Sequence, residues 1–191
     1  PRILTLLGAD AIPDSKEARA AYHLSPENRR LAVRRLTLAA MLLYTFPGSP
    51  TLYYGDEAGM EGFEDPMNRR GYPWGREDQR LLALYRTLGR LRKERRSLQE
   101  GDITYLTADG GLLVYCRTLD GERTYTALNT GDTSRTVTLP WENDFATDAV
   151  SMQRFWVRNG TLRIDLPPCD GVVLILSLIH ISEPTRQAEI S

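Results

Sequence analysis

The sequence predicts an α/β unit over its first part and an antiparallel β-sandwich after it. Two helical patterns enclose a short run that is apolar on both faces, which is typical of a strand in a buried parallel sheet. From Gly101 onward, short strand-like runs alternate with Asp-Gly and Asn-Gly dipeptides, which favour hairpin turns because both central residues need positive φ. This change of pattern places the domain boundary near Glu100 and Gly101.

The first predicted helix runs from Ser25 to Tyr44. Ser25 is a good N-cap, Pro26 fits the first helical position, and Glu27 suits the positive end of the helix dipole. The turn signal Pro47-Gly48-Ser49-Pro50 then ends the helix. A strand is predicted next, at Thr51–Tyr54, because the run is short, β-branched and aromatic.

A long irregular loop is predicted from Gly55 to about Gly75, since this stretch is rich in Gly, Pro and charge. The second helix is predicted from Asp78 to Arg96. Its apolar side chains fall on one face at helical spacing: Leu81, Leu84, Tyr85, Leu88 and Leu91.

The sandwich strands are predicted from alternating runs between turn signals, at the spacing of a two-sheet domain. They are Ile103–Leu106, Leu112–Thr118, Thr124–Asn129, Arg135–Leu139, Leu162–Leu166 and Val172–Ile175.

The composition is that of an ordinary globular protein and excludes several classes. The 191 residues are 41% hydrophobic and 26% charged, and the net charge of −1 gives no field that would attract nucleic acid or an anionic membrane. No apolar run approaches the ~18 residues of a membrane-spanning helix. Cys116 and Cys169 make neither a disulfide framework nor a metal cluster, and we expect both to be buried thiols of β-strands. No cofactor is expected.

An ordered set of motifs carries a family resemblance. Pro50–Met60 reads PTLYYGDEAGM, Asp65–Arg70 reads DPMNRR, Tyr72–Trp74 reads YPW, and the chain opens with PRILT. Together they resemble the eighth barrel strand and following loop of glycoside hydrolase family 13, the α-amylase family. The Asp-Pro-X-Asn-Arg-Arg segment is similar to the neopullulanase, cyclomaltodextrinase and maltogenic amylase group. The resemblance is strong over residues 1–100 and weaker over 101–176.

The resemblance implies the last part of a (β/α)8 TIM barrel at residues 1–100, with strand 8, its loop and two helices, and a C-terminal β-sandwich at 101–176. It implies a fragment of a retaining hydrolase of α-1,4-linked glucans, of cyclodextrin, maltodextrin or pullulan type. The three catalytic carboxylates, and calcium ligands where the family has them, would lie upstream of Pro1. The fragment alone would therefore be inactive, and residues 1 to about 100 would be poorly ordered without the rest of the barrel.

Asp65 and Arg69 are the candidate substrate-binding residues. A barrel builds its site from loops at the C-terminal ends of its strands, and this loop would lie there. A carboxylate accepts and a guanidinium fork donates, which suits vicinal sugar hydroxyls. The resemblance implies that the pair binds a glucose unit on the non-reducing side of the cleavage point. The alternative is a salt bridge that holds the loop, and both roles are compatible.

Other conspicuous residues favour structural roles. Asp56 and Glu57 are adjacent, and neighbouring strand residues point to opposite faces, so they cannot easily flank one glycosidic bond. Trp74 either packs on a sugar or closes the loop, the second being favoured. The basic run Arg90–Arg96 is interpreted as a solvated helix end rather than a nucleic-acid site. His23 has no partners at metal spacing.

Two rival functions remain open: a non-catalytic carbohydrate-binding or structural module of the same fold, and another family-13 specificity such as an α-glucosidase. The expected partner is an α-glucan oligosaccharide, with neither nucleic acid nor membrane. The group resemblance implies a cytoplasmic, homodimeric parent.

Residues Ser177–Ser191 resemble the translation of a transposon-type sequencing adapter, so we expect a non-native tail and do not consider His180 a ligand.

Overall fold

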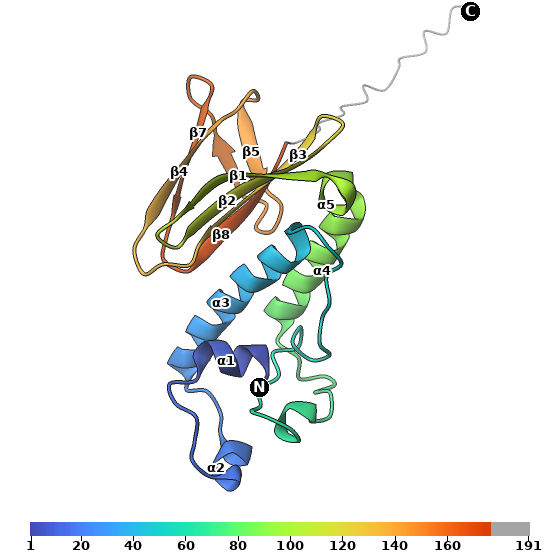
Figure 1. Cartoon of the computed structure of the whole chain (residues 1–191), viewed down its shortest axis with the longest axis vertical. Coiled ribbons are helices and arrows are strands. Elements are labelled where there is room, and N and C mark those ends of the chain that lie inside the picture. Colours follow the sequence, from blue (N-terminus) through green and yellow to red (C-terminus); the bar gives the residue numbers. More distant parts are fainter. Residues whose placement is uncertain (177–191) are drawn as a thin grey trace, which may run out of the picture.

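The computed structural model describes residues 1–176, and the proposed non-native tail lies outside the described residues. Helices occupy the first part of the described chain and strands the rest, with the helices below the sheets in Figure 1. The helical elements are α1 (Ile3–Gly8), α2 (Lys16–Ala21), α3 (Pro26–Thr45), the 3₁₀ turn η1 (Met67–Arg69), α4 (Gln79–Glu94) and α5 (Arg96–Glu100).

The start of α3 confirms the capping argument made for Ser25, and α4 begins with a similar cap. At the start of α3, Ser25 accepts a hydrogen bond from the Asn28 N–H at 3.1 Å, and Pro26 is the first helical residue. At the start of α4, the Asp78 carboxylate accepts from the N–H groups of Arg80 and Leu81. Local side-chain chemistry therefore fixes where both helices begin. The shorter α1, α2 and α5 were not predicted.

The predicted strand at Thr51–Tyr54 is wrong for this structure, in which the segment is irregular. A parallel strand needs neighbours for its backbone groups, and residues 1–101 of the described chain contain no other strand. Tyr53 and Tyr54 are 45% and 42% exposed. Their rings instead flank the guanidinium of Arg2, whose central carbon lies 4.4 and 4.6 Å from the two ring centroids.

The strands form two antiparallel sheets packed around one apolar core. The larger sheet has the order β1-β2-β3-β8-β5-β6, and the smaller pairs β4 with β7. The core between them includes Val114, Ile164 and Leu174. The strands are β1 (Asp102–Asp109), β2 (Leu112–Leu119), β3 (Glu122–Asn129), β4 (Arg135–Pro140), β5 (Phe145–Asp148), β6 (Arg154–Trp156), β7 (Thr161–Leu166) and β8 (Asp170–Ile175).

Six strands lie where the sequence predicts them, and the hairpin turns explain why. Asp120 and Gly121 have φ of 48° and 84°, and Asn159 and Gly160 have φ of 51° and 69°. Both pairs thus adopt the positive φ that Asp-Gly and Asn-Gly turns require. The sequence did not predict β5 and β6, which have only 4 and 3 residues and no such turn between them.

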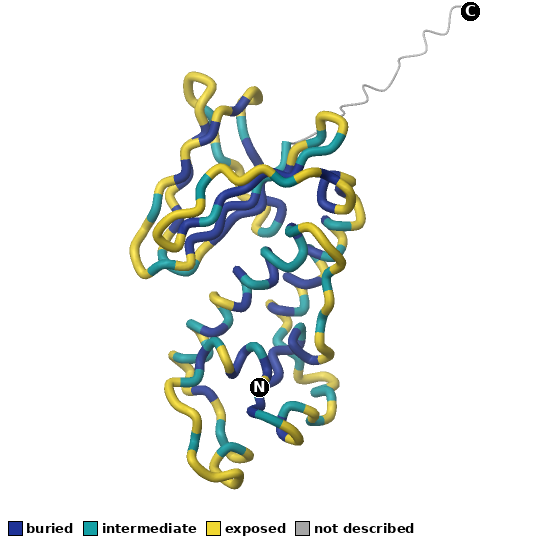
Figure 2. The backbone as a smooth tube through the Cα atoms, in the orientation of Figure 1, coloured by how far each residue is buried: buried dark blue, intermediate teal, exposed yellow. Residues whose placement is uncertain are grey.

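The helices cover the outer face of the larger sheet. Helix α3 packs on β3 and β8, and a shared apolar cluster joins Leu38 of α3 to Leu128 and Val173 of these strands. Figure 2 shows this buried zone running through α3, α4 and the middle strands. At Gly171 of β8, a Cβ would lie 2.9 Å from the Leu38 side chain, so the absence of a side chain lets the helix approach the sheet.

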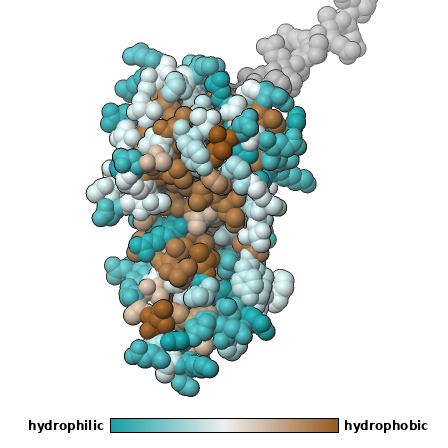
Figure 3. Space-filling view, in the orientation of Figure 1, coloured by the Kyte–Doolittle hydropathy of each residue, from teal (hydrophilic) through white to brown (hydrophobic). Residues whose placement is uncertain are grey.

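Part of the apolar face of α3 stays partly exposed. Leu31 and Leu42 are half-buried, whereas Leu36 and Leu38 are buried. A groove of about 350 Å³ lies beside Leu42 and Leu113, and Figure 3 shows apolar side chains gathered at the middle of the molecule. Part of the apolar face of α3 is therefore accessible beside the sheet.

Two arginines join the C-terminal end of α3 to the sandwich and to α4. Arg117 of β2 is 1% exposed, and it donates to the Thr45 carbonyl at 3.0 Å and to the Gly101 carbonyl at 2.7 and 3.2 Å. Arg92 of α4 donates to the carbonyls of Tyr44 and Phe46 at 2.8 and 2.9 Å. These bonds satisfy carbonyls that a helix end leaves without partners.

Two smaller predictions need correction. Cys116 is buried in β2 as expected, but Cys169 is half-buried in the turn before β8, with φ of 50°. The basic run at the end of α4 is only partly solvated. Arg95 is 9% exposed and forms an ion pair with Glu122 at 3.6 Å, because α5 turns the chain back against the sheet.

Replacing Arg117 with Met should lower the free energy of unfolding by about 2–4 kcal/mol, because two buried carbonyls lose their donors. The exposed Arg163 of β7 is the matched control, and Arg163→Met should change stability by less than about 0.5 kcal/mol. Urea unfolding followed by circular dichroism measures both. Equal, small effects would contradict the role of Arg117.

Candidate functional site

The long loop between α3 and α4 is held to the start of the chain by two hydrogen bonds at Gly62. The Arg2 N–H donates to the Gly62 carbonyl at 2.8 Å, and the Gly62 N–H donates to the Thr5 hydroxyl at 2.9 Å. A Cβ at residue 62 would overlap the backbone carbonyl of Met67. The loop therefore folds back on itself at a point where only glycine fits.

Helix α3 supplies the second support of the loop through Arg29. This side chain pairs with Glu61 and with Asp78, the latter at 3.4 Å, and it also donates to the Gly59 carbonyl at 3.3 Å. Glu61 in turn accepts from the Leu24 N–H at 2.9 Å. The segment that precedes Asp65 is thus fixed from several directions.

The structure brings the two predicted binding residues together. The Arg69 Nε lies 3.2 Å from Asp65 Oδ1, at an i,i+4 spacing that spans η1. The side chains are 67% and 64% exposed. One ion pair leaves the second carboxylate oxygen and the outer guanidinium nitrogens able to meet a ligand. The geometry is compatible with sugar binding and with a loop-holding salt bridge.

Asp56 and Glu57 have separate partners within the loop. Asp56 accepts from Arg2 at 3.3 Å, whereas Glu57 accepts from the Gly55 N–H at 2.8 Å. Burial raises the pKa of the Asp56 carboxyl above its usual range, and the Arg2 hydrogen bond acts in the opposite direction. Both carboxylates organise the turn at Gly55, in line with the structural role predicted for them.

Arg2, which no sequence pattern singled out, is 1% exposed and contacts this loop at Tyr53, Tyr54 and Asp56. Its Nη1 donates to the Tyr54 carbonyl and to Asp56, while Nε and Nη2 have no hydrogen-bond partner within residues 1–176. The contacts span more than fifty positions of sequence, so no local pattern could reveal them.

Trp74 is 81% exposed and contacts the Tyr72 ring, with centroids 4.5 Å apart. The indole therefore does not close the loop by burial, which was the role favoured from sequence. Asp65 and Trp74 belong to one exposed, polar and aromatic loop.

The described chain offers no metal site and no membrane segment. Within residues 1–176, no group of three or more His, Cys, Asp or Glu side chains could hold a metal ion. The His23 side chain is 71% exposed and lies 3.7 Å from Glu61. No helix in this part of the chain is long and apolar enough to cross a bilayer.

A family comparison matches the β-rich part of the chain. Residues 103–173 fit the model described as the maltogenic amylase C-terminal domain. An amylopullulanase from Thermoanaerobacter thermohydrosulfuricus is 34% identical in an alignment that covers 91% of this chain but 12% of that protein. A cyclomaltodextrinase from Geobacillus thermopakistaniensis is 31% identical over 88% of this chain and 26% of its own length.

Solved structures agree with this match. An Anoxybacillus α-amylase is 30% identical with a TM-score of 0.67, over 78% of this chain and 34% of that one. A maltogenic amylase from S. marinus is 26% identical with a TM-score of 0.62, over 81% of this chain and 21% of its own.

The helical segment with its long loop, joined to an antiparallel sandwich, is the end of a (β/α)8 barrel and its C-terminal domain, the architecture of the α-amylase type of glycoside hydrolase. The chain belongs to glycoside hydrolase family 13. Proteins named neopullulanase, cyclomaltodextrinase and maltogenic α-amylase are among those that it resembles.

Replacing Gly62 with Ala should disrupt the loop, because the new Cβ meets backbone that cannot move aside. Gly71 lies in the same loop, and a Cβ added there would have no neighbour within 4 Å, so Gly71→Ala is the matched control. Amide hydrogen exchange of residues 55–75 should rise strongly in the first variant and stay unchanged in the second. Unchanged exchange in Gly62→Ala would refute the close approach.

Proposed function

We propose that the chain is the downstream part of a retaining hydrolase of α-1,4-linked glucans, of cyclodextrin, maltodextrin or pullulan type. The names of its relatives and the Asp-Pro-X-Asn-Arg-Arg segment support this proposal. The group resemblance adds a cytoplasmic, homodimeric parent as a further expectation. The chain spans a minor share of each of these relatives, so the activity is proposed for the longer protein.

Asp65 and Arg69 are proposed to bind a glucose unit of the substrate. The observation that carries this role is their exposed ion pair, which keeps unused acceptor and donor atoms side by side. Vicinal hydroxyls of a pyranose present a donor and an acceptor at similar spacing. Charge-assisted bonds of this kind exceed neutral hydrogen bonds in strength.

No residue of this chain is proposed as catalytic, and the chain alone is proposed to be inactive. A retaining mechanism needs two carboxyl groups about 5–5.5 Å apart across one glycosidic bond. Asp56 accepts a hydrogen bond from Arg2, and Glu57 accepts one from the Gly55 N–H, so the two carboxylates have separate structural partners. The same observation favours a second candidate function, a non-catalytic carbohydrate-binding or structural module. Another family-13 specificity, such as an α-glucosidase, is the remaining alternative.

In the longer enzyme, Asp65→Asn or Arg69→Gln should raise KM for long α-glucans about tenfold, because one charge-assisted contact is lost. Arg96 and Glu100 form an equally exposed i,i+4 pair at 3.3 Å in α5. Arg96→Gln and Glu100→Gln are the matched controls and should leave KM unchanged. Steady-state kinetics on a maltodextrin and thermal unfolding decide the question. An unchanged KM with a lowered melting temperature would assign the pair to loop structure alone.

The proposed division at Glu100 and Gly101 predicts unequal resistance to protease. In the isolated chain, residues 1 to about 100 should be cleaved first, because barrel helices without the full barrel expose apolar faces. Residues 101–176 should persist as a sandwich with its own core. Limited proteolysis followed by mass spectrometry checks this, and equal survival of both parts would contradict it.

A further inference from the structure

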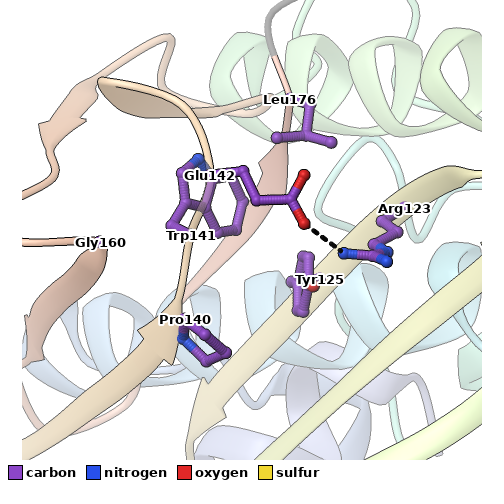
Figure 4. A pocket seen from close by; sticks show the side chains of 7 residues that line it. All are labelled: Arg123, Tyr125, Pro140, Trp141, Glu142, Gly160 and Leu176. Atoms are coloured by element: carbon purple, nitrogen blue, oxygen red, sulfur yellow. Dashed lines mark ion pairs between the residues drawn. The ribbon is translucent and has the colours of Figure 1, made fainter.

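A small cleft opens at one end of the sandwich, away from the loop described above. It has a volume of about 260 Å³ and lies between the start of β3, the end of β4 and the end of β8. Figure 4 shows its lining residues: Arg123, Tyr125, Pro140, Trp141, Glu142, Gly160 and Leu176. In Figure 1 these strands lie in the upper part of the molecule, and the loop that follows α3 lies in the lower part.

The walls of the cleft are aromatic. The Tyr125 and Trp141 rings are tilted by 48° with centroids 5.2 Å apart, and Trp141 is 5% exposed while Tyr125 is half-buried. The indole N–H donates to the Phe145 carbonyl at 3.2 Å, which fixes the ring in place. Aromatic walls held in this way favour the C–H faces of a ligand rather than its polar groups.

The rim of the cleft carries one cation and one anion. The Arg123 Nη1 lies 3.7 Å from Glu142 Oε1, and the two side chains are 47% and 87% exposed. Figure 4 shows this pair beside the aromatic walls. The two charges cancel, so the cleft does not select an ionic ligand. It offers donors and acceptors together over an apolar floor, which is the combination that matches a neutral polyol ring.

We propose that this cleft is a second, non-catalytic binding site for a glucosyl unit of an α-glucan. The choice of an α-glucan as the ligand rests on the proposed function, whereas the polyol chemistry rests on the cleft itself. The volume lies just below the range of about 300–1,000 Å³ typical of ligand pockets, so it fits a single sugar ring. A site so far from the Asp65 loop would hold a long chain without contacting the bond to be cleaved.

The chain contains three tryptophans. Trp141 lines the cleft, Trp74 lies in the loop with Asp65, and Trp156 lies on the edge strand β6. We would label the whole chain with 5-fluorotryptophan and titrate it with maltotriose while recording ¹⁹F NMR spectra. The exposed Trp74→Phe and Trp156→Phe variants assign the resonances.

The expected result is a saturable shift of the Trp141 resonance that exceeds any shift at Trp156, which is linked to Trp141 through Phe145. The double variant Arg123→Gln, Glu142→Gln should weaken this binding about tenfold or more, because the polar contacts of the rim are lost. The matched control is Arg163→Gln, Asp165→Asn, an exposed pair at 3.8 Å on β7, which should bind as the unaltered chain does. Thermal unfolding of each variant verifies that it is folded.

An unshifted Trp141 resonance at saturating maltotriose would overturn the proposal, as would equal weakening in the rim and control variants. A shift at Trp74 alone would support the proposed loop site and refute the cleft. A shift at Trp141 alone would support the cleft and tell against Asp65 and Arg69 as binding residues.

Discussion

The rest of the structure depends on how the C-terminal end of α3 is held. The last carbonyls of this helix meet no further turn, and together they form the negative end of its dipole. Arg117 from the sheet and Arg92 from α4 bind them, and the Thr45 hydroxyl lies 2.6 Å from the Tyr115 hydroxyl. One helix end thereby fixes the sheet, the second long helix and the connection through Gly101. The apolar cluster of Leu38, Leu128 and Val173 can then pack in a defined register.

The loop that carries the candidate site is positioned by α3 and by the start of the chain. A loop of about twenty residues with one short 3₁₀ turn has only turn-type backbone bonds of its own, so contacts from outside help to fix its conformation. The start of the chain contributes Arg2 and Thr5, and the first turns of α3 contribute Arg29. Asp65 and Arg69 consequently project from a loop that is fastened at several points, although both side chains are exposed. A binding pair on such a support loses little entropy when a ligand arrives.

Local chemistry decided what could be predicted from the sequence. Caps at Ser25 and Asp78, and turns at Asp120-Gly121 and Asn159-Gly160, act over a few residues, so α3, α4 and most strands were predictable. The Asp65–Arg69 contact was predictable for the same reason. The strand predicted at Thr51–Tyr54 does not form, because a parallel strand needs neighbouring strands and residues 1–101 contain none. The roles of Arg2 and Arg117 depend on contacts far apart in the chain, which no spacing rule encodes.

The buried Arg117 has only neutral carbonyls among its hydrogen-bond partners. A guanidinium remains charged at every ordinary pH, and a carbonyl does not titrate, so this joint has no proton to gain or lose. The loop is fastened differently, through the carboxylates of Asp56, Glu61 and Glu64. The Arg19 hydrogen bond holds the pKa of the Glu64 carboxyl below its usual range, so acid that protonates Glu64 weakens this contact and leaves Arg117 unchanged. The molecule therefore has two kinds of fastening: charged carboxylates hold the candidate binding loop, and neutral carbonyls hold the joint between helix and sandwich.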